Sequence, residues 1–311
     1  MNILITGAGG FVGKNLVESF TNDLFHVYSP DLEELDLTDS QAVQEYLKHH
    51  PIDVIVHSAT TLRQGTEYCA DVCEKNLRMF FNLLKHKKTQ TKLINFGSGS
   101  EYSRLYWHEK MQETFFDTHI PDDSHSFSKY LISKYIENSA DTSLITLRIF
   151  GIFGKYEDHR YKFISNAIAK NLLHMPITIN KNVSYDYIYI NDFCEIVKFF
   201  AQNKTKYSSY NVTPTKSIDL ITIVNIINKI SDYQSPIHVL NEGLGVHYSG
   251  NNERLCAELP HFKFSEYKNS ILDLYNHYKA NIDLLDKTAL QKDAYLEYAK
   301  KLKNNYFDHK A

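Results

Sequence analysis

MNILITGAGGFVGKNLVESF, residues 1–20, joins an apolar run, a glycine-rich turn and an apolar pattern with helical spacing. Residues 1–5 are typical of a buried strand, and the residues after the turn are typical of a helix. Gly7 permits a sharp reversal, Gly10 lets backbone N–H groups approach a pyrophosphate, and Gly13 allows close packing of helix on strand. The stretch therefore predicts a dinucleotide site with the phosphates at the helix N-terminus, the alternative being a plain glycine-rich connection.

Strand-like and helical segments alternate through the first half of the chain. Apolar strand-like runs occupy residues 25–29, 52–59, 92–97 and 144–149, and helical patterns occupy residues 40–49, 71–84 and 128–139. Strands that alternate with helices pair in parallel through right-handed crossovers. The expected fold class is therefore α/β, a Rossmann-type doubly wound parallel sheet whose ligands gather at the carboxyl ends of the strands.

Three regions are expected along the chain. Residues 1–155 should form mainly the dinucleotide-binding Rossmann domain, and residues 156–279 mainly a smaller C-terminal substrate-binding lobe with segments that return to the core. Residues 280–311 should be a helical C-terminal extension that packs on the body or forms a subunit contact. With 311 residues and 43% hydrophobic content, the chain can bury a substantial core.

A second motif, YLISK, stands at residues 130–134. In a helix its Tyr130 and Lys134 lie one turn apart on the same face. The Tyr130 phenol could transfer a proton, and the Lys134 ammonium would lower the pKa of that phenol and reach the ribose of a cofactor. Ser98 would hydrogen-bond the reacting oxygen. These three are the expected catalytic residues, and an ordinary solvated helix pair is the alternative.

In their order along the chain these motifs resemble the extended short-chain dehydrogenase/reductase family, in its nucleotide-sugar branch of epimerase/dehydratase-like enzymes. The resemblance extends to about Tyr275. Its further supporting residues are DVIVHSA (53–59), Asn76, SGSEY (98–102), LRIFGIFG (147–154), YIYIND (187–192) and YNV (210–212). It implies an NAD(P)-dependent oxidoreductase that acts on a nucleotide-linked sugar, most like the 4-keto reductases of the branch.

Departures from the family patterns narrow the implied reaction. Gly99 and Ser100 stand where the sugar 4,6-dehydratases place Asp and Glu, so dehydration is not expected. Ser100 and Lys162 stand where enzymes resembling GDP-fucose synthase place Cys and His, although His159 lies close to the second position. The resemblance therefore implies reduction of a nucleotide-linked 4-keto-6-deoxy sugar, with hydride to C4 and the proton from Tyr130. The alternatives are a 4-epimerase that retains NAD and a dinucleotide-binding sensor or structural protein.

The segment that follows the second strand bears on the cofactor. Residues 31–39 lead quickly to the next helix, which leaves little room for the extra helix and strand of longer relatives. Asp31 would accept a hydrogen bond from the adenosine ribose of NAD, or it is a solvated turn residue, whereas the resemblance to reductases implies NADPH. The cofactor is therefore NAD or NADP, and its expected contacts are Gly7, Gly10, Phe11, Val12, Gly13, Asp31, Ala59, Tyr130 and Lys134.

Substrate contacts are expected mainly from the second half of the chain. Arg160 and Lys162 could neutralise a diphosphate, unless their segment is a polar surface loop. Tyr185 stands where the family often has a diphosphate-binding Arg, and Arg254 could replace that cation. The expected substrate-binding residues are Ser100, Arg160, Lys162 and Arg254.

Composition excludes several other classes of protein. The net charge of −3 supplies no general attraction for nucleic acid. The sequence contains no apolar segment long enough to span a bilayer and starts with a strand pattern instead of a signal peptide, so a cytoplasmic enzyme is expected. The four cysteines form no zinc pattern, and neither a metal nor disulfides are expected. A homodimer through helices of the cofactor domain is implied by the resemblance only.

Overall fold

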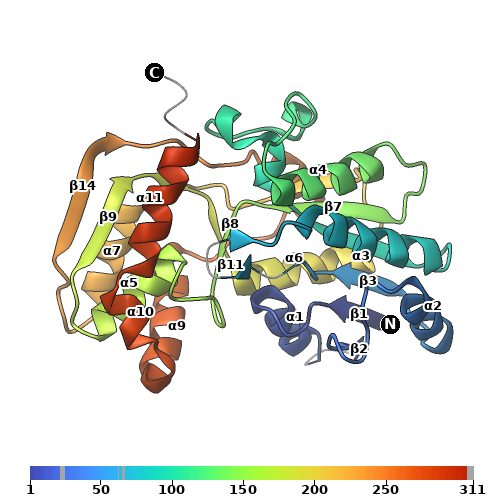
Figure 1. The fold of residues 1–311 in the computed structure, drawn as a ribbon, viewed down its shortest axis with the longest axis horizontal. Coiled ribbons are helices and arrows are strands. Elements are labelled where there is room, and N and C mark those ends of the chain that lie inside the picture. The colour runs from blue at the N-terminus through green and yellow to red at the C-terminus, as the bar shows by residue number, and fades with distance from the viewer. Residues whose placement is uncertain (22–24, 62, 65–66, 307–311) are drawn as a thin grey trace.

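The computed structural model describes residues 1–21, 25–61, 63–64 and 67–306. A six-stranded parallel sheet in the order β12-β7-β6-β3-β1-β2 forms its centre (Figure 1). Its strands are β1 (Asn2–Thr6), β2 (His26–Tyr28), β3 (Val54–His57), β6 (Lys92–Ser98), β7 (Leu144–Ile149) and β12 (Ser209–Val212). This sheet confirms the expected Rossmann-type α/β class.

Helices cover both faces of the sheet. The helices α1 (Phe11–Thr21) and α6 (Ile190–Gln202) contribute to one apolar cluster with the sheet. On the other face, α2 (Ser40–His49), α3 (Val72–His86) and α4 (Ser124–Glu137) contribute to a second cluster. Most residues of β1, β3, β6, β7 and β12 are buried because both faces of the sheet are covered in this way.

The direction of winding reverses between β1 and β3, where ligands bind in open sheets of this type. Here the chain passes so close to itself that side chains do not fit. A Cβ added to Gly7, whose φ is +68°, would lie 2.7 Å from the Ala59 Cα. A Cβ added to Gly13 would lie 2.1 Å from the Gly7 carbonyl oxygen. Residues 29–39 form only turns, which agrees with the short connection expected from the sequence.

A smaller lobe lies beside the sheet, at the left of Figure 1. Its core combines α5 (Phe163–Leu172), α7 (Leu220–Ile230) and α9 (Tyr267–Ala280) with the parallel pair β9 (Ile177–Asn182) and β14 (Ile237–Leu244). Within the described residues of the terminal extension, α10 (Lys287–Gln291) packs on α5 and α11 (Ala294–Tyr306) packs on β9. The extension therefore packs on the body of its own chain, which was one of the two expected outcomes.

Short elements lie between the longer helices and strands. They are β4 (Arg63–Gln64), β5 (Glu67–Tyr68), β8 (Gly151–Phe153), β10 (Ser184–Tyr185), β11 (Tyr187–Tyr189), β13 (Ile218–Asp219), α8 (Glu253–Glu258) and the 3-10 turns η1 (Gly99–Tyr102), η2 (Arg104–Tyr106), η3 (Glu113–Phe115) and η4 (Ile282–Leu284). The chain returns from the lobe region to the main sheet through α6 and β12. None of the described helices is long and apolar enough to span a membrane.

The helix that carries the YLISK motif begins four residues earlier than its apolar pattern indicated. Asp123 caps it, because its carboxylate accepts a hydrogen bond of 2.9 Å from the Ser126 backbone N–H. The helix begins with the polar residues 124–126, which give no apolar periodicity, so its first turn was missed.

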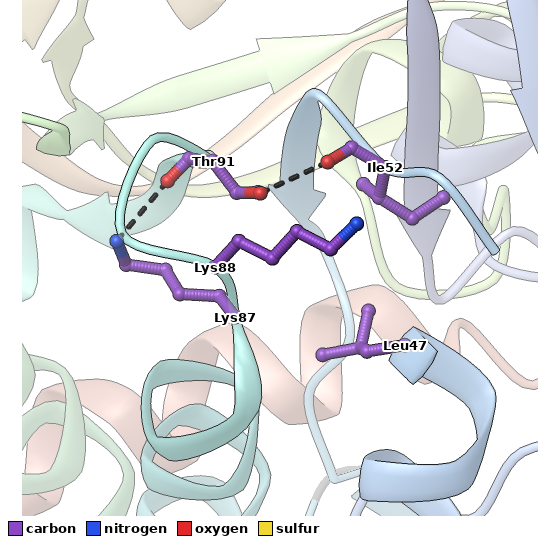
Figure 2. A pocket seen from close by; sticks show the side chains of 5 residues that line it. All are labelled: Leu47, Ile52, Lys87, Lys88 and Thr91. Carbon is purple, nitrogen blue, oxygen red and sulfur yellow. Dashed lines mark hydrogen bonds between the residues drawn. The ribbon is translucent and has the colours of Figure 1, made fainter. Parts of the chain in front are cut away.

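A small pocket at the opposite edge of the sheet has no features of a site. Leu47, Ile52, Lys87, Lys88 and Thr91 line it, and Figure 2 shows Thr91 between its two hydrogen bonds, to Lys87 and to Ile52. Its volume of about 10 Å³ has room for one water molecule at most. It belongs to the packing of the amino-terminal ends of β3 and β6.

The contact at Gly13 yields a stability prediction. Gly13→Ala should lower the free energy of unfolding by about 1–3 kcal/mol, because the added methyl overlaps the Gly7 carbonyl oxygen. Gly9→Ala is the matched control, since nothing lies within 4 Å of a Cβ there. Urea denaturation of both variants measures the difference. Equal stability of the two would contradict the close approach of the turn to α1.

Candidate active site

The glycine-rich turn presents an open helix N-terminus. Gly9 and Gly10 are exposed, and the Gly10 N–H is used within the turn in a hydrogen bond of 3.0 Å to the Gly7 carbonyl. The N–H groups of the first turn of α1, which begins at Phe11, have no acceptor within the helix by geometry. Such a terminus fits the phosphates of a dinucleotide.

The two strand ends beside this turn are tied together. The Thr6 hydroxyl accepts a hydrogen bond of 3.2 Å from the Ala59 N–H and lies 2.9 Å from Nδ1 of His57. Burial lowers the pKa of His57 to about 3, so this histidine is neutral and structural. The contacts fix the segment after β3 against the glycine turn.

Asn76 on α3 connects the same segment to α4. Its side-chain oxygen accepts hydrogen bonds from the Thr61 N–H and hydroxyl, at 2.9 and 3.0 Å. Its amide donates to the Ser128 hydroxyl at 2.9 Å, two residues before Tyr130. Asn76 therefore positions α4 relative to the expected cofactor crevice.

The structure brings Tyr130 and Lys134 together on α4, where Asp117 meets both. Tyr130 is buried, with its ring 5.4 Å from that of Phe116. The Lys134 ammonium lies 3.2 Å from the Tyr130 hydroxyl and 2.8 and 3.0 Å from the two oxygens of Asp117. The Tyr130 hydroxyl donates a short hydrogen bond to Asp117. A carboxylate thus completes a three-residue cluster that the sequence did not indicate.

The pKa of Tyr130 is raised in this structure, whereas the sequence predicted that Lys134 would lower it. Burial raises the pKa of Tyr130, the hydrogen bond to Asp117 raises it further, and Lys134 offsets these effects only in part. Hydrogen bonds from Lys134 and Tyr130 lower the pKa of the Asp117 carboxyl. The expectation of a lowered pKa for Tyr130 is therefore wrong for the structure described, because burial and the hydrogen bond to Asp117 outweigh the effect of Lys134.

Ser98 ends β6 and caps η1. Its hydroxyl accepts hydrogen bonds from the N–H and the hydroxyl of Ser100, at 3.1 and 2.9 Å. Its own N–H donates to Glu101 at 2.7 Å, which completes a capping box. Ser98 is half-buried and firmly held, whereas Ser100 is buried, and its hydroxyl supports Ser98.

A buried ion network lies behind Ser98. The Arg148 guanidinium on β7 bonds Glu101 at 2.7 Å and Glu137 of α4 at 2.5 Å, and Arg148 is wholly buried. It also lies 4.2 Å from the ring centroid of Phe116, the neighbour of Asp117. One side chain therefore links β7, η1, α4 and the loop that carries Asp117.

Aromatic side chains from two loops form a wall beside Ser98. The rings of Trp107 and Tyr248 stack at 3.9 Å, and the Arg104 guanidinium lies 5.0 Å from the Trp107 ring. A Cβ added to Gly99 would lie 2.7 Å from the Tyr248 hydroxyl, so Gly99 admits this phenol next to Ser98. The sequence did not predict this aromatic wall, and its one local signal is the glycine at position 99.

The other expected contacts are more dispersed. Asp31 is exposed, and its carboxylate accepts two hydrogen bonds of 2.9 Å within its own turn. Arg160 pairs with Asp158, and Lys162 stands at the N-cap position of α5, where its side chain makes no capping hydrogen bond. Arg254 lies 3.8 Å from Glu113 and 4.5 Å from the Tyr207 ring, in contact with residues that flank the edge strand β12. The described contacts of these side chains do not include Ser98, Tyr130 or Lys134.

Residues 3–213 match the model of the NAD dependent epimerase/dehydratase family. The chain belongs to this family. GDP-L-colitose synthase of Yersinia pseudotuberculosis is 24% identical over 256 residues, which cover 75% of this chain and 83% of that protein. Membership makes the chain an oxidoreductase-type enzyme of a family that uses NAD or NADP.

Solved structures agree on the fold. The GDP-mannoheptose C4 reductase of Campylobacter jejuni with NADP bound has a TM-score of 0.75 at 18% identity, covering 89% of this chain and 98% of that chain. The dTDP-glucose 4,6-dehydratase of Bacillus anthracis str. Ames in complex with NAD has a TM-score of 0.75 at 18% identity, covering 91% of this chain and 98% of that chain.

No group of three or more potential metal ligands occurs in the described part of this enzyme.

The ion network behind Ser98 should be essential for stability. Arg148→Met should lower the free energy of unfolding by about 3–5 kcal/mol, because Glu101 is left buried without a counter-charge. Arg160→Met, which removes an exposed ion pair, should change it by less than about 0.5 kcal/mol. Chemical denaturation measures both, and a small effect of Arg148→Met would contradict the network's role.

Proposed function

We propose that this enzyme reduces a nucleotide-linked 4-keto-6-deoxy sugar with NADH or NADPH. The observation that carries the proposal is the Tyr130 phenol on α4, whose hydroxyl lies 3.2 Å from the Lys134 ammonium. A ketone that accepts a hydride needs such a proton donor. Gly99 and Ser100 supply neither carboxylate that dehydration would require.

Each catalytic side chain has one task in this proposal. A reduced nicotinamide bound at the glycine-rich turn would supply the hydride that C4 accepts. Ser98 donates a hydrogen bond to the keto oxygen and holds it in place. As the negative charge grows on that oxygen, the Tyr130 hydroxyl transfers its proton to it, and an alcohol results. Lys134 stabilises the phenolate until water returns a proton to it.

The expected cofactor contacts remain part of the proposal. The first turn of α1, beginning at Phe11, would bind the pyrophosphate, and Ala59 would border the crevice. Asp31 follows β2 by three residues, at the carboxyl end of the sheet, where a ribose hydroxyl would lie. Its second carboxylate oxygen could accept a hydrogen bond from that hydroxyl. A carboxylate at this place would repel the 2′-phosphate of NADP, so Asp31 favours NAD.

A homodimer and a cytoplasmic location are further parts of this proposal. The helices α3 and α4 pack side by side and expose Phe81 and Tyr135, whose rings lie 5.2 Å apart. Such an exposed aromatic pair on two cofactor-domain helices is suited to a second copy of the chain. Sedimentation of the purified enzyme would test the dimer.

The function is tested by the fate of the cofactor. The cofactor released from the purified enzyme is identified by mass spectrometry, and NADH or NADPH is then supplied with a panel of nucleotide-linked 4-keto-6-deoxy sugars. Stoichiometric oxidation of one reduced cofactor is the expected result. Retained NAD without net oxidation would favour the 4-epimerase, and the absence of any cofactor binding would contradict both enzymes.

The role of Tyr130 gives a direct variant. Tyr130→Phe should reduce kcat about 100- to 10,000-fold, because the proton donor is lost, while the affinity for the cofactor stays near that of the parent. Tyr135→Phe is the matched control, since Tyr135 lies on the same helix but is exposed. Steady-state kinetics and cofactor titration measure both. Turnover that survives Tyr130→Phe would remove Tyr130 from the mechanism.

A further inference from the structure

The loop before α4 directs a carboxylate at the proposed proton donor. Asp117 lies between η3 and α4 with φ at +67°, a backbone conformation rare for residues other than glycine, asparagine and aspartate. Its preceding neighbour Phe116 is buried between the Tyr130 ring and the Arg148 guanidinium. Phe116 therefore anchors the loop directly before Asp117.

Asp117 and Lys134 are the charged groups that touch the Tyr130 hydroxyl in the described structure. Other charged groups nearby are directed elsewhere. The Lys129 ammonium on α4 donates to the Phe96 carbonyl at 2.8 Å, and Arg148 bonds its two carboxylates. From the opposite loop, the Tyr248 phenol lies beside Gly99.

We propose that Asp117 is a positioning residue that keeps Tyr130 protonated and thereby extends reduction to alkaline pH. This inference rests on the proposed function. The Tyr130 hydroxyl donates to Asp117, so ionisation of the phenol would place a second negative charge directly beside the carboxylate. The same carboxylate forms an ion pair with Lys134, whose ammonium would otherwise stabilise the phenolate of Tyr130. Asp117 is about half exposed, so the group remains accessible to water.

The substitution Asp117→Asn isolates the charge. Asparagine has nearly the same shape, tolerates the left-handed backbone and still accepts a hydrogen bond from Tyr130. It removes the negative charge and leaves Lys134 to act on the phenol alone. Asp122→Asn is the control, because Asp122 is an exposed acidic residue on the same loop.

The first measurement is the ionisation of Tyr130 in the absence of sugar. Phenolate absorbance is titrated in the parent and in Asp117→Asn, and the corresponding curves of Tyr130→Phe variants are subtracted to isolate one of the 22 tyrosines. The Tyr130 transition should move to lower pH in Asp117→Asn and stay in place in Asp122→Asn. If the pH of the Tyr130 transition were the same in Asp117→Asn as in the parent, the inference would be overturned. A change in the variant's cofactor affinity would not rescue it.

The second measurement is the pH profile of kcat for reduction. Between neutral and alkaline pH, the ratio of Asp117→Asn to parent kcat should fall about tenfold, and the ratio for Asp122→Asn should stay constant. A ratio that is equally low at every pH would mean a merely structural role and would overturn the inference. If no keto sugar is reduced by the parent enzyme, the proposed function fails, while the absorbance titration still decides the role of Asp117.

Discussion

The site depends on the two ion pairs that the buried Arg148 guanidinium makes. A cation without access to water must be compensated, and here Glu101 and Glu137 provide the two carboxylates. Glu101 uses its other oxygen to hold the Ser98 N–H. The ion pairs of Arg148 therefore position Ser98 through Glu101 and position α4 through Glu137. Buried side chains therefore hold both Ser98 and the helix that carries Tyr130.

Local patterns predicted the framework of this enzyme well. The glycine-rich turn requires small residues because backbone meets backbone at Gly7 and Gly13, and this constraint is visible in the sequence. Apolar runs predicted the central strands because both faces of the sheet are covered. Tyr130 and Lys134 were paired correctly because a helical turn fixes their spacing.

Contacts that loops bring together could not be predicted from the sequence. Asp117 lies 13 residues before Tyr130 and meets it only through a left-handed turn anchored by Phe116, and no periodic pattern records such a path. Trp107 and Tyr248 stack across 141 residues of chain. The pKa of Tyr130 was predicted in the wrong direction for the same reason, since the prediction included Lys134 and omitted burial and Asp117. The expected diphosphate ligands Arg160 and Arg254 are proposals still, and the structure pairs both with carboxylates.

The central claim is that hydride moves from a reduced cofactor to C4 of a nucleotide-linked sugar. Transfer of deuterium from cofactor deuterated at its reactive carbon tests this most directly, with the sugar product analysed by NMR and mass spectrometry. The account predicts one deuterium at C4 for each cofactor oxidised, and none with Tyr130→Phe at matched times. Release of an unlabelled sugar, or a label at another carbon, would contradict it.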